Sequence, residues 1–201
     1  RDQGLDLTDA TVRGYQTKRP LVFHSDSSDL VGLLCHRKAR EGGLSKIVSS
    51  MTVHNVMLDE APELLETLYQ PVYFDRRGEE RAGVHPWYAL AVFHRHDGYL
   101  TCRYNPGFIH SSQRHADAPR YTDMQQAALE TLDALANRDD LCFVMDLMPG
   151  DVQLLNNYVV LHGRTDYVDY DDVERKRHML RLWLSNPDAR PLPDSFSAMY
   201  Y

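Results

Sequence analysis

Short apolar runs separated by polar turns extend along most of this chain, and this pattern predicts a protein built mainly from β-strands. Runs rich in β-branched and aromatic residues, bounded by Gly, Pro, Asp or Ser, are typical of strands. The runs that fit this description span residues 21–24, 30–35, 46–49, 72–74, 88–93, 99–104, 141–147, 152–155, 158–161 and 177–184.

Two turn signals lie between these strands. Asp97-Gly98 falls within residues 88–104, and Asp-Gly is a typical two-residue turn of a β-hairpin. Pro149-Gly150-Asp151 indicates a tight turn between the next two strands, 141–147 and 152–155. The chain is therefore expected to form a hairpin over residues 88–104 and a tight turn at residues 149–151.

Two segments have the pattern of a helix. Residues 51–69 form the first, which we expect to be broken near Pro62 because proline suits a first helical turn. Thr122-Asp123-Met124-Gln125 opens the second as a capping box. One apolar stripe of this second helix would contain Met124, Ala128, Leu132 and Leu135.

Many short strands with few helices predict a β-barrel or sandwich with helices packed outside it. The chain has 201 residues, of which 43% are hydrophobic and 25% charged, as expected of one globular domain spanning residues 1–201. It begins at Arg1 without an initiator Met, and only about twenty residues precede the first predicted strand. We therefore expect part of an N-terminal region to be missing.

Charge and cysteine content narrow the possible partners. The net charge is −7 and no long basic stripe occurs, so we expect no nucleic-acid partner. No apolar run approaches the roughly 20 residues of a membrane span, and we expect no membrane partner. Three dispersed cysteines (Cys35, Cys102 and Cys142) predict reduced thiols and a cytoplasmic protein. A small molecule is the expected partner, and the oligomeric state cannot be inferred.

The segment His24-Ser25-Asp26 follows the apolar run 21–23 and is the first candidate for chemistry. Residues two apart in a strand point to the same face, so the imidazole and the carboxylate would project together. One further histidine would complete the 2-His-1-carboxylate triad that binds non-haem iron. His115-Ala116-Asp117 has the same spacing, so the motif alone does not identify a metal site.

Among the ten histidines, His162 is the best candidate for the third ligand. It ends the predicted strand 158–161, whereas the other candidates lie in polar stretches, at the hairpin tip or in the first helix. A histidine at the end of an apolar strand is more often a core or edge residue. The assignment of His162 as a metal ligand therefore needs additional evidence.

The predicted strand 177–184 provides such evidence. Strict alternation would place Arg177 and Arg181 on one face and His178 on the other. Arginines on an inward apolar face need anionic partners, and the guanidinium fork suits a carboxylate. An edge strand with solvent-facing arginines would explain the same pattern.

Together these residues resemble a known family. The chain resembles the taurine dioxygenase (TauD/TfdA) family of Fe(II)- and 2-oxoglutarate-dependent oxygenases, over residues 12–183. The ordered series that carries the resemblance is His24-x-Asp26, Gly42-Gly43-Leu44-Ser45, Pro149-Gly150-Asp151, His162 and Arg177-x-x-x-Arg181. The resemblance implies a double-stranded β-helix (jelly-roll) core with flanking helices.

The resemblance also implies roles for individual residues. His24, Asp26 and His162 match the iron ligands, which are also the catalytic centre. Arg177 matches the arginine that binds the distal carboxylate of 2-oxoglutarate. Ser45 stands where the family has a threonine hydroxyl for that carboxylate, and Arg181 matches an arginine near the substrate and the iron-side end of 2-oxoglutarate. His115-Ala116-Asp117 has no counterpart.

The implied reaction consumes O2 and 2-oxoglutarate at Fe(II), releases succinate and CO2, and oxidises an unidentified small molecule. Retention of Asp26 implies hydroxylation rather than halogenation, because related halogenases lack this carboxylate. The chain departs from the family in lacking most of its N-terminal region and any clear match for the residues that hold taurine's amine.

Other interpretations remain at this point. The chain could be a non-catalytic metal- or ligand-binding relative of the same fold. A cupin-like site at His94 and His96 would need a Glu and a later His, and residues 99–104 offer neither. Several residues could line the substrate side, although packing, turns or the loop surface explain them equally simply: Tyr15, Gln16, Tyr104, Asn105 and Phe108.

Overall fold

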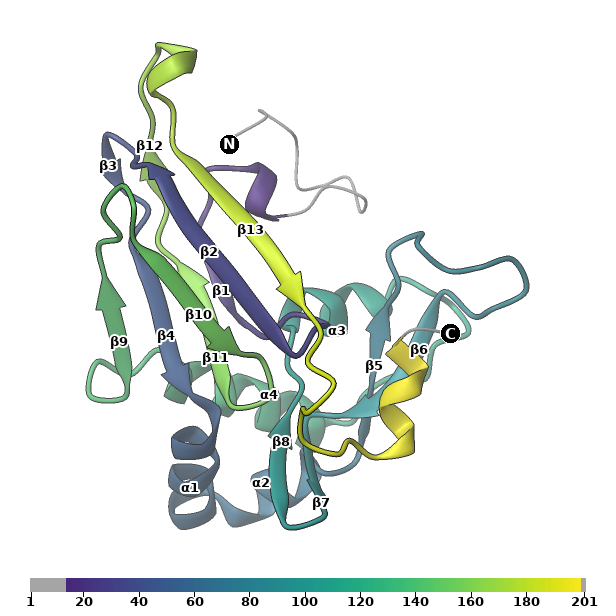
Figure 1. Cartoon of the computed structure of the whole chain (residues 1–201). Helices are drawn as coiled ribbons and strands as arrows, with labels where there is room; N and C mark the ends of the chain where they lie inside the picture. Colours follow the sequence, from purple (N-terminus) through teal and green to yellow (C-terminus); the bar gives the residue numbers. More distant parts are fainter. Residues whose placement is uncertain (1–13, 200–201) are drawn as a thin grey trace.

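Two antiparallel sheets that face each other form the centre of the computed structural model, which describes residues 14–199 (Figure 1). The three-stranded sheet has the order β10-β2-β13, where β10 is Val152–Asn156, β2 is Leu30–Arg37 and β13 is His178–Leu184. The four-stranded sheet has the order β1-β11-β4-β9, with β1 Leu21–His24, β11 Val160–Arg164, β4 Ser45–Ser49 and β9 Cys142–Met145. The predicted double-stranded β-helix is thereby confirmed.

Short elements close one end of the two sheets. The strand β3 (Glu41–Gly42) pairs with β12 (Tyr167–Val168), and η2 (Val173–Arg175) lies beyond β12. Gly42 has φ 69°, and a Cβ there would lie 2.4 Å from the Asp166 carbonyl oxygen. The two strands can therefore approach this closely only with glycine at residue 42.

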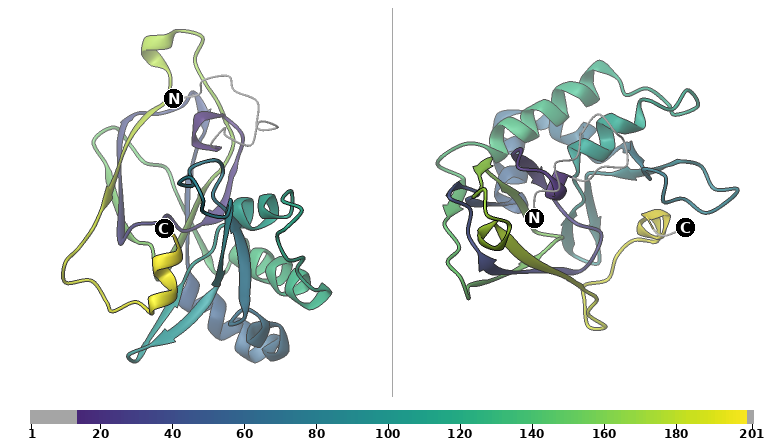
Figure 2. Two further views of the ribbon diagram at one scale, coloured as in Figure 1. Left: turned by 90° about the vertical axis from the view of Figure 1, so that its right-hand side faces the viewer. Right: turned by 90° about the horizontal axis from the view of Figure 1, so that it is seen from above.

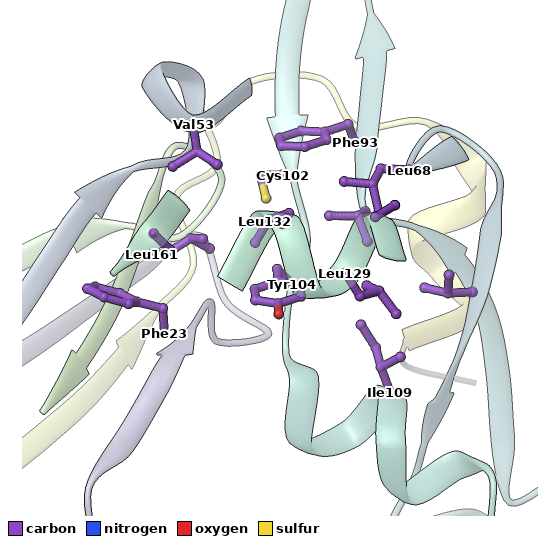
Figure 3. Packing of buried hydrophobic residues seen from close by; sticks show 14 of the residues in the cluster. Phe23, Val53, Leu68, Phe93, Cys102, Tyr104, Ile109, Leu129, Leu132 and Leu161 are labelled. Atoms are coloured by element: carbon purple, nitrogen blue, oxygen red, sulfur yellow. The ribbon is translucent and has the colours of Figure 1, made fainter. Parts of the chain in front are cut away.

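Helices cover the outer face of the four-stranded sheet, on the side away from the other sheet (Figures 1 and 2). These are α1 (Ser50–Glu60), α2 (Pro62–Thr67) and α4 (Asp123–Ala136), and Pro62 opens α2 as predicted. Thr122 and Gln125 form the predicted capping box of α4. Figure 3 shows the core between helices and sheet, with Phe23 and Leu161 from the sheet against Leu132 of α4.

A second part of the chain lies beside this core (Figure 1). It contains the pair β5 (Pro71–Asp75) and β6 (Trp87–Ala91), the pair β7 (Phe93–His96) and β8 (Tyr99–Cys102), α3 (Pro106–Ser112) and η3 (Asp194–Met199). Asp97 (φ 47°) and Gly98 (φ 78°) form the predicted hairpin turn, as positive φ at both positions is typical of type I′.

Some predicted boundaries are wrong. The predicted strand 88–93 is two strands, because the backbone amides of Val92 and Phe93 both donate to the Leu68 carbonyl and end the ladder with β5. The strand predicted at 158–161 begins at Val160 and continues to Arg164, so His162 lies in its middle. The turn at 149–151 joins β9 and β10, which belong to different sheets.

The helical stripe of α4 is also narrower than predicted. Ala128, Leu132 and Leu135 are buried, but Met124 is 46% exposed because it lies in the first turn, beyond the edge of the packed surface. From Gly14 to Met199, the helices are all too short or too polar to cross a bilayer.

The difference between Leu132 and Met124 predicts different costs of truncation. Leu132 is completely buried in the core, so Leu132→Ala should lower the free energy of unfolding by about 2–5 kcal/mol. Met124→Ala on the same helix is the control and should change it by less than about 0.5 kcal/mol. Urea unfolding followed by circular dichroism measures both, and equal effects would contradict the described packing of α4.

Candidate metal centre

Three potential metal ligands converge between the two sheets. His24 ends β1 and stands directly opposite His162 of β11 in the antiparallel ladder, while Asp26 follows β1 by two residues. Their ligand atoms all lie within 4.8 Å of one another. The Nε2 atoms of His24 and His162 are 3.9 Å and 3.6 Å from the carboxylate oxygens of Asp26, and the two imidazole centroids are 4.3 Å apart.

Local hydrogen bonds aim the His24 and Asp26 side chains. Nδ1 of His24 lies 2.8 Å from the Val22 carbonyl oxygen, which can only accept, so Nδ1 carries the proton and the Nε2 lone pair faces the other ligands. The Asp26 backbone amide donates to Oδ1 of Asn157 (3.1 Å). Nε1 of Trp183 in β13 donates to Oδ2 of Asp26 (2.9 Å). Groups from both sheets therefore orient this carboxylate.

A buried arginine holds the loop that carries Asp26. The Arg103 side chain is 2% exposed, and its guanidinium donates to the Ser25 carbonyl oxygen and to the Ser27 hydroxyl (2.9 Å). The Ser25 amide donates to the Tyr104 carbonyl oxygen (2.7 Å). Residues 25–27 are thus fixed from the side of the chain that follows β8.

The electrostatics of the three residues favour a bound cation. Burial lowers the pKa of His24, and it lowers the pKa of His162 to about 3, with His24 and Arg181 adding to the effect at His162. Burial raises the pKa of Asp26, but His162, His24, Arg181 and the Trp183 N–H outweigh it and leave that pKa below its usual value. Two neutral imidazoles and one carboxylate therefore point lone pairs at one another, which fits a divalent metal ion.

The two arginines expected on one face lie at different places. The ladder of β13 starts at His178, so Arg177 lies just before the strand, and the bulge beside it leaves His36 of β2 without a partner residue in β13. The Arg181 guanidinium packs on the rings of Tyr15 (4.5 Å) and Trp183 (4.7 Å), beside the three ligands. Arg177 instead lies against Gly43, where a Cβ would be 3.0 Å from its Nε.

Arg177 and Ser45 occupy the end of the sheets near β3 and β12. The Arg177 guanidinium carbon is 5.3 Å from the centroid of the Tyr167 ring. Within residues 14–199 no carboxylate lies within ion-pair distance of Arg177 or Arg181. The Ser45 hydroxyl is buried and donates to Oε1 of Gln153 at 2.6 Å.

The rival motif at residues 115–117 has a structural role. Nε2 of His115 lies 3.1 Å from Oδ1 of Asp75, a fully buried carboxylate that also accepts from Nε of Arg114 (2.8 Å). Asp117 turns the other way and pairs with His85 (3.3 Å). The two side chains of this motif therefore do not share a site.

The cupin-like alternative has no support either. His94 Nε2 lies 3.0 Å from the Ala91 carbonyl oxygen, and its ring packs on Phe196. His96 lies at the hairpin tip beside Asp97 (3.8 Å). In the part of the chain that the structure describes, the triad is the one group of three metal-binding side chains close enough to share an ion.

The candidate substrate residues separate into two groups. Tyr104 is buried and packs in the core, Phe108 packs against it, and Asn105 caps α3 by accepting from the Phe108 amide (3.2 Å). Tyr15 and Gln16 belong to η1 (Gly14–Gln16), and Tyr15 lies under Arg181. Of these side chains, that of Tyr15 contacts Arg181 of the centre, whereas Tyr104 reaches the loop of the ligands through its backbone.

Sequence reasoning missed Arg103, Asn157 and Trp183 as supports of Asp26. Trp183 had a usable signal, because alternation in β13 places it on the same face as Arg181. Arg103 and Asn157 had none, since their contacts join segments that are 76 to 131 residues apart.

Comparisons with known proteins agree with this geometry. The model of the "Taurine catabolism dioxygenase TauD, TfdA family" matches residues 4–183. FR-33289 synthase of Streptomyces rubellomurinus is 39% identical over 203 residues, which cover 98% of this chain and 59% of that protein. The taurine hydroxylase-like protein SAT17 of Stachybotrys chartarum is 30% identical, over 81% of this chain and 41% of that protein. The chain thus spans about half the length of the curated relatives it matches.

Solved structures share the fold at lower identity. An asparagine oxygenase in complex with Fe(II), 3-hydroxyasparagine and succinate superimposes with a TM-score of 0.66 and 20% identity, over 86% of this chain and 52% of that one. The non-haem iron oxygenase OrfP in complex with Fe and α-ketoglutaric acid gives a TM-score of 0.60 and 18% identity, over 84% and 50% of the two chains.

The environment of Asp75 predicts a specific dependence of stability on pH. Burial raises the pKa of Asp75, but hydrogen bonds from Arg114, the Arg77 amide and His115 outweigh it and lower this pKa to about 2. Since the unfolded value lies near 3.8, the stabilisation is complete above about pH 4 and is lost as the pH falls towards 2. Asp75→Asn should remove about 2 kcal/mol of this acid-dependent stability.

Chemical unfolding at several pH values between 5 and 2 measures this effect. The difference in unfolding free energy between the native protein and Asp75→Asn should shrink steadily below pH 4. Asp117→Asn, which removes a carboxylate from an exposed pair, is the control and should leave the pH slope as it is. Parallel curves for the native protein and Asp75→Asn would contradict the described ion pairs.

Proposed function

Because the chain belongs to the TauD/TfdA family of taurine catabolism dioxygenases, we propose that it is an Fe(II)- and 2-oxoglutarate-dependent dioxygenase acting on a small molecule. The observation that carries this proposal is the convergence of the ligand atoms of His24, Asp26 and His162 within 4.8 Å of one another, with Asp26 and His162 buried and His24 partly buried. The chain spans only about half the length of its curated relatives. The activity is therefore proposed for the centre that these three residues form.

His24, Asp26 and His162 would hold the iron. Their donor set, two neutral imidazole nitrogens and one carboxylate, is the set typical of non-haem Fe(II) oxygenases and leaves positions open for other ligands. When bound, the iron supplies the oxidation of substrate by O2, coupled to conversion of 2-oxoglutarate to succinate and CO2. Retention of Asp26 favours hydroxylation over halogenation, as the family resemblance implies.

Ser45 and Arg177 would bind the far end of the cosubstrate. His162 pairs with Ile47, and Ser45 lies two residues along β4, so Ser45 is a diagonal neighbour of His162 at about 7–8 Å. This separation suits a short dicarboxylate whose other end reaches the metal. Arg177 provides a cation at the same end, because its side chain lies against Gly43, two residues before Ser45.

Arg181 and Trp183 would act on the iron side of the centre. The Trp183 N–H holds Oδ2 of Asp26, so it limits the orientations in which this carboxylate can bind metal. Arg181 brings a positive charge beside the triad, which favours an anionic group of the cosubstrate or substrate there. The three cysteines are free thiols in the structure, which favours a reducing compartment such as the cytoplasm.

Removal of the third ligand tests the proposal. Anaerobic Fe(II) with 2-oxoglutarate should give a weak visible charge-transfer band, and His162→Ala should abolish it by lowering iron affinity more than about a hundredfold. The absorbance titration is followed by an assay of succinate released in air.

His96→Ala is the matched control, because it removes a histidine from the hairpin tip without touching the triad, and it should keep the band. A band of normal intensity in His162→Ala would exclude His162 as a ligand. Native protein that binds Fe(II) but releases no succinate with any candidate substrate would instead support a non-catalytic relative.

A further inference from the structure

A buried amide group at Gln153 lacks a partner in the space between the two sheets. Gln153 is 7% exposed and lies in β10 between Val152 (64% exposed) and Leu154 (54% exposed), so its side chain points inward. Its Oε1 accepts from the Ser45 hydroxyl of the opposite sheet at 2.6 Å. Its Nε2 is inaccessible to solvent and has no hydrogen-bond partner within residues 14–199.

An unpaired buried amide nitrogen needs an explanation. Native proteins pair nearly all such groups with protein atoms, ordered water or a ligand, because burial without an acceptor is unfavourable. Apolar residues serve at an inward position of a sheet without this cost. The glutamine at residue 153 therefore indicates that a group outside the described structure accepts hydrogen bonds from its N–H groups.

The pair of Ser45 and Gln153 always presents two hydrogens to such an acceptor. In the orientation described, the single hydroxyl hydrogen of Ser45 is used on Oε1, and both N–H groups of Gln153 remain free. If the amide were turned by 180°, one N–H would bond to the Ser45 oxygen, and the hydroxyl and the other N–H would remain. In either case Gln153 contributes at least one donor.

The position of Arg177 indicates that the acceptor is an anion. Arg177 packs against Gly43, two residues before Ser45. Its charge also acts on Cys35, whose backbone is two residues from Leu33, the residue that pairs with Gln153. The Asp169 carboxylate accepts from the Arg177 backbone amide and attracts the Arg177 charge, but it does not lie within ion-pair distance of the guanidinium. This guanidinium and two neutral donors therefore gather at the same end of the sheets. A carboxylate satisfies all three.

We propose that Gln153 binds the distal carboxylate of 2-oxoglutarate, together with Arg177 and Ser45, through the amide that Ser45 holds in place. This inference rests on the proposed function, because it assigns a further binding residue to the same cosubstrate. It makes the site a carboxylate clamp that spans both sheets, in which Arg177 and Gln153 of β10 donate to the carboxylate and Ser45 of β4 orients the Gln153 amide.

The test compares two ligands in two variants. Gln153→Leu removes the donors, and Gln153→Glu keeps the shape and the acceptor for the Ser45 hydroxyl but replaces the donors by an anionic oxygen. Mn(II)-loaded protein is titrated with 2-oxoglutarate and with 2-oxopentanoate, which has the same chain length and a methyl group in place of the distal carboxylate. Isothermal calorimetry gives the dissociation constants, and Mn(II) affinity is measured separately.

We expect the dissociation constant for 2-oxoglutarate to rise about tenfold or more in Gln153→Leu and further in Gln153→Glu. The constants for 2-oxopentanoate and for Mn(II) should stay within about twofold. Ser45→Ala combined with Gln153→Leu should cost less than the sum of the single changes, since the two side chains act as one unit.

Unchanged 2-oxoglutarate binding in both variants would show that the Gln153 amide does not bind the carboxylate. This result would overturn the inference and leave the proposed function intact. Equal losses for both ligands would indicate a merely structural role and would also overturn it. Native protein that binds Mn(II) but neither ligand would overturn the proposed function itself.

Discussion

The pairing of β1 with β11 is the constraint on which the rest of the structure depends. It sets His24 opposite His162 on the inner face and leaves Phe23 and Leu161 for the helical core on the outer face. Side chains alternate with a period of two, so a slip of one residue would turn an imidazole into the core. The close approach requires glycine at residue 163, because a Cβ there would lie 2.7 Å from the Leu21 carbonyl oxygen.

The same register places the apolar core on the outer face of the four-stranded sheet and the candidate metal ligands on its inner face. The outer face is closed by α1 and α4, whose buried side chains are mostly apolar. The space between the two sheets collects groups that are unfavourable in the absence of ligands: two uncharged imidazoles and a carboxylate from β1, β11 and the loop after β1, and two arginines from the β13 segment of the opposite sheet. Proteins commonly place such costs at functional sites and recover them elsewhere.

Local rules predicted much of this arrangement from sequence. The His24-x-Asp26 spacing, the capping box at Thr122, the proline that opens α2 and the Asp97-Gly98 turn depend on neighbours within four residues, and each describes the structure. The place of His162 within its strand and the exposure of Met124 were predicted wrongly, because a strand boundary and the edge of a packing surface are set by distant segments. Gln153 gave no signal, since an inward glutamine is recognisable only once Ser45 is seen opposite it.

The contacts of the centre run between the sheets rather than within one of them. Trp183 of the three-stranded sheet holds Asp26, which follows the four-stranded sheet, and Ser45 reaches Gln153 in the opposite direction. A ligand that engages residues of both sheets would add to these two hydrogen bonds between their inner faces. Binding to the folded state alone raises stability by mass action. Ligand binding at this centre should therefore raise the free energy of unfolding, and the rise in stability can be used to measure how much of the site is occupied.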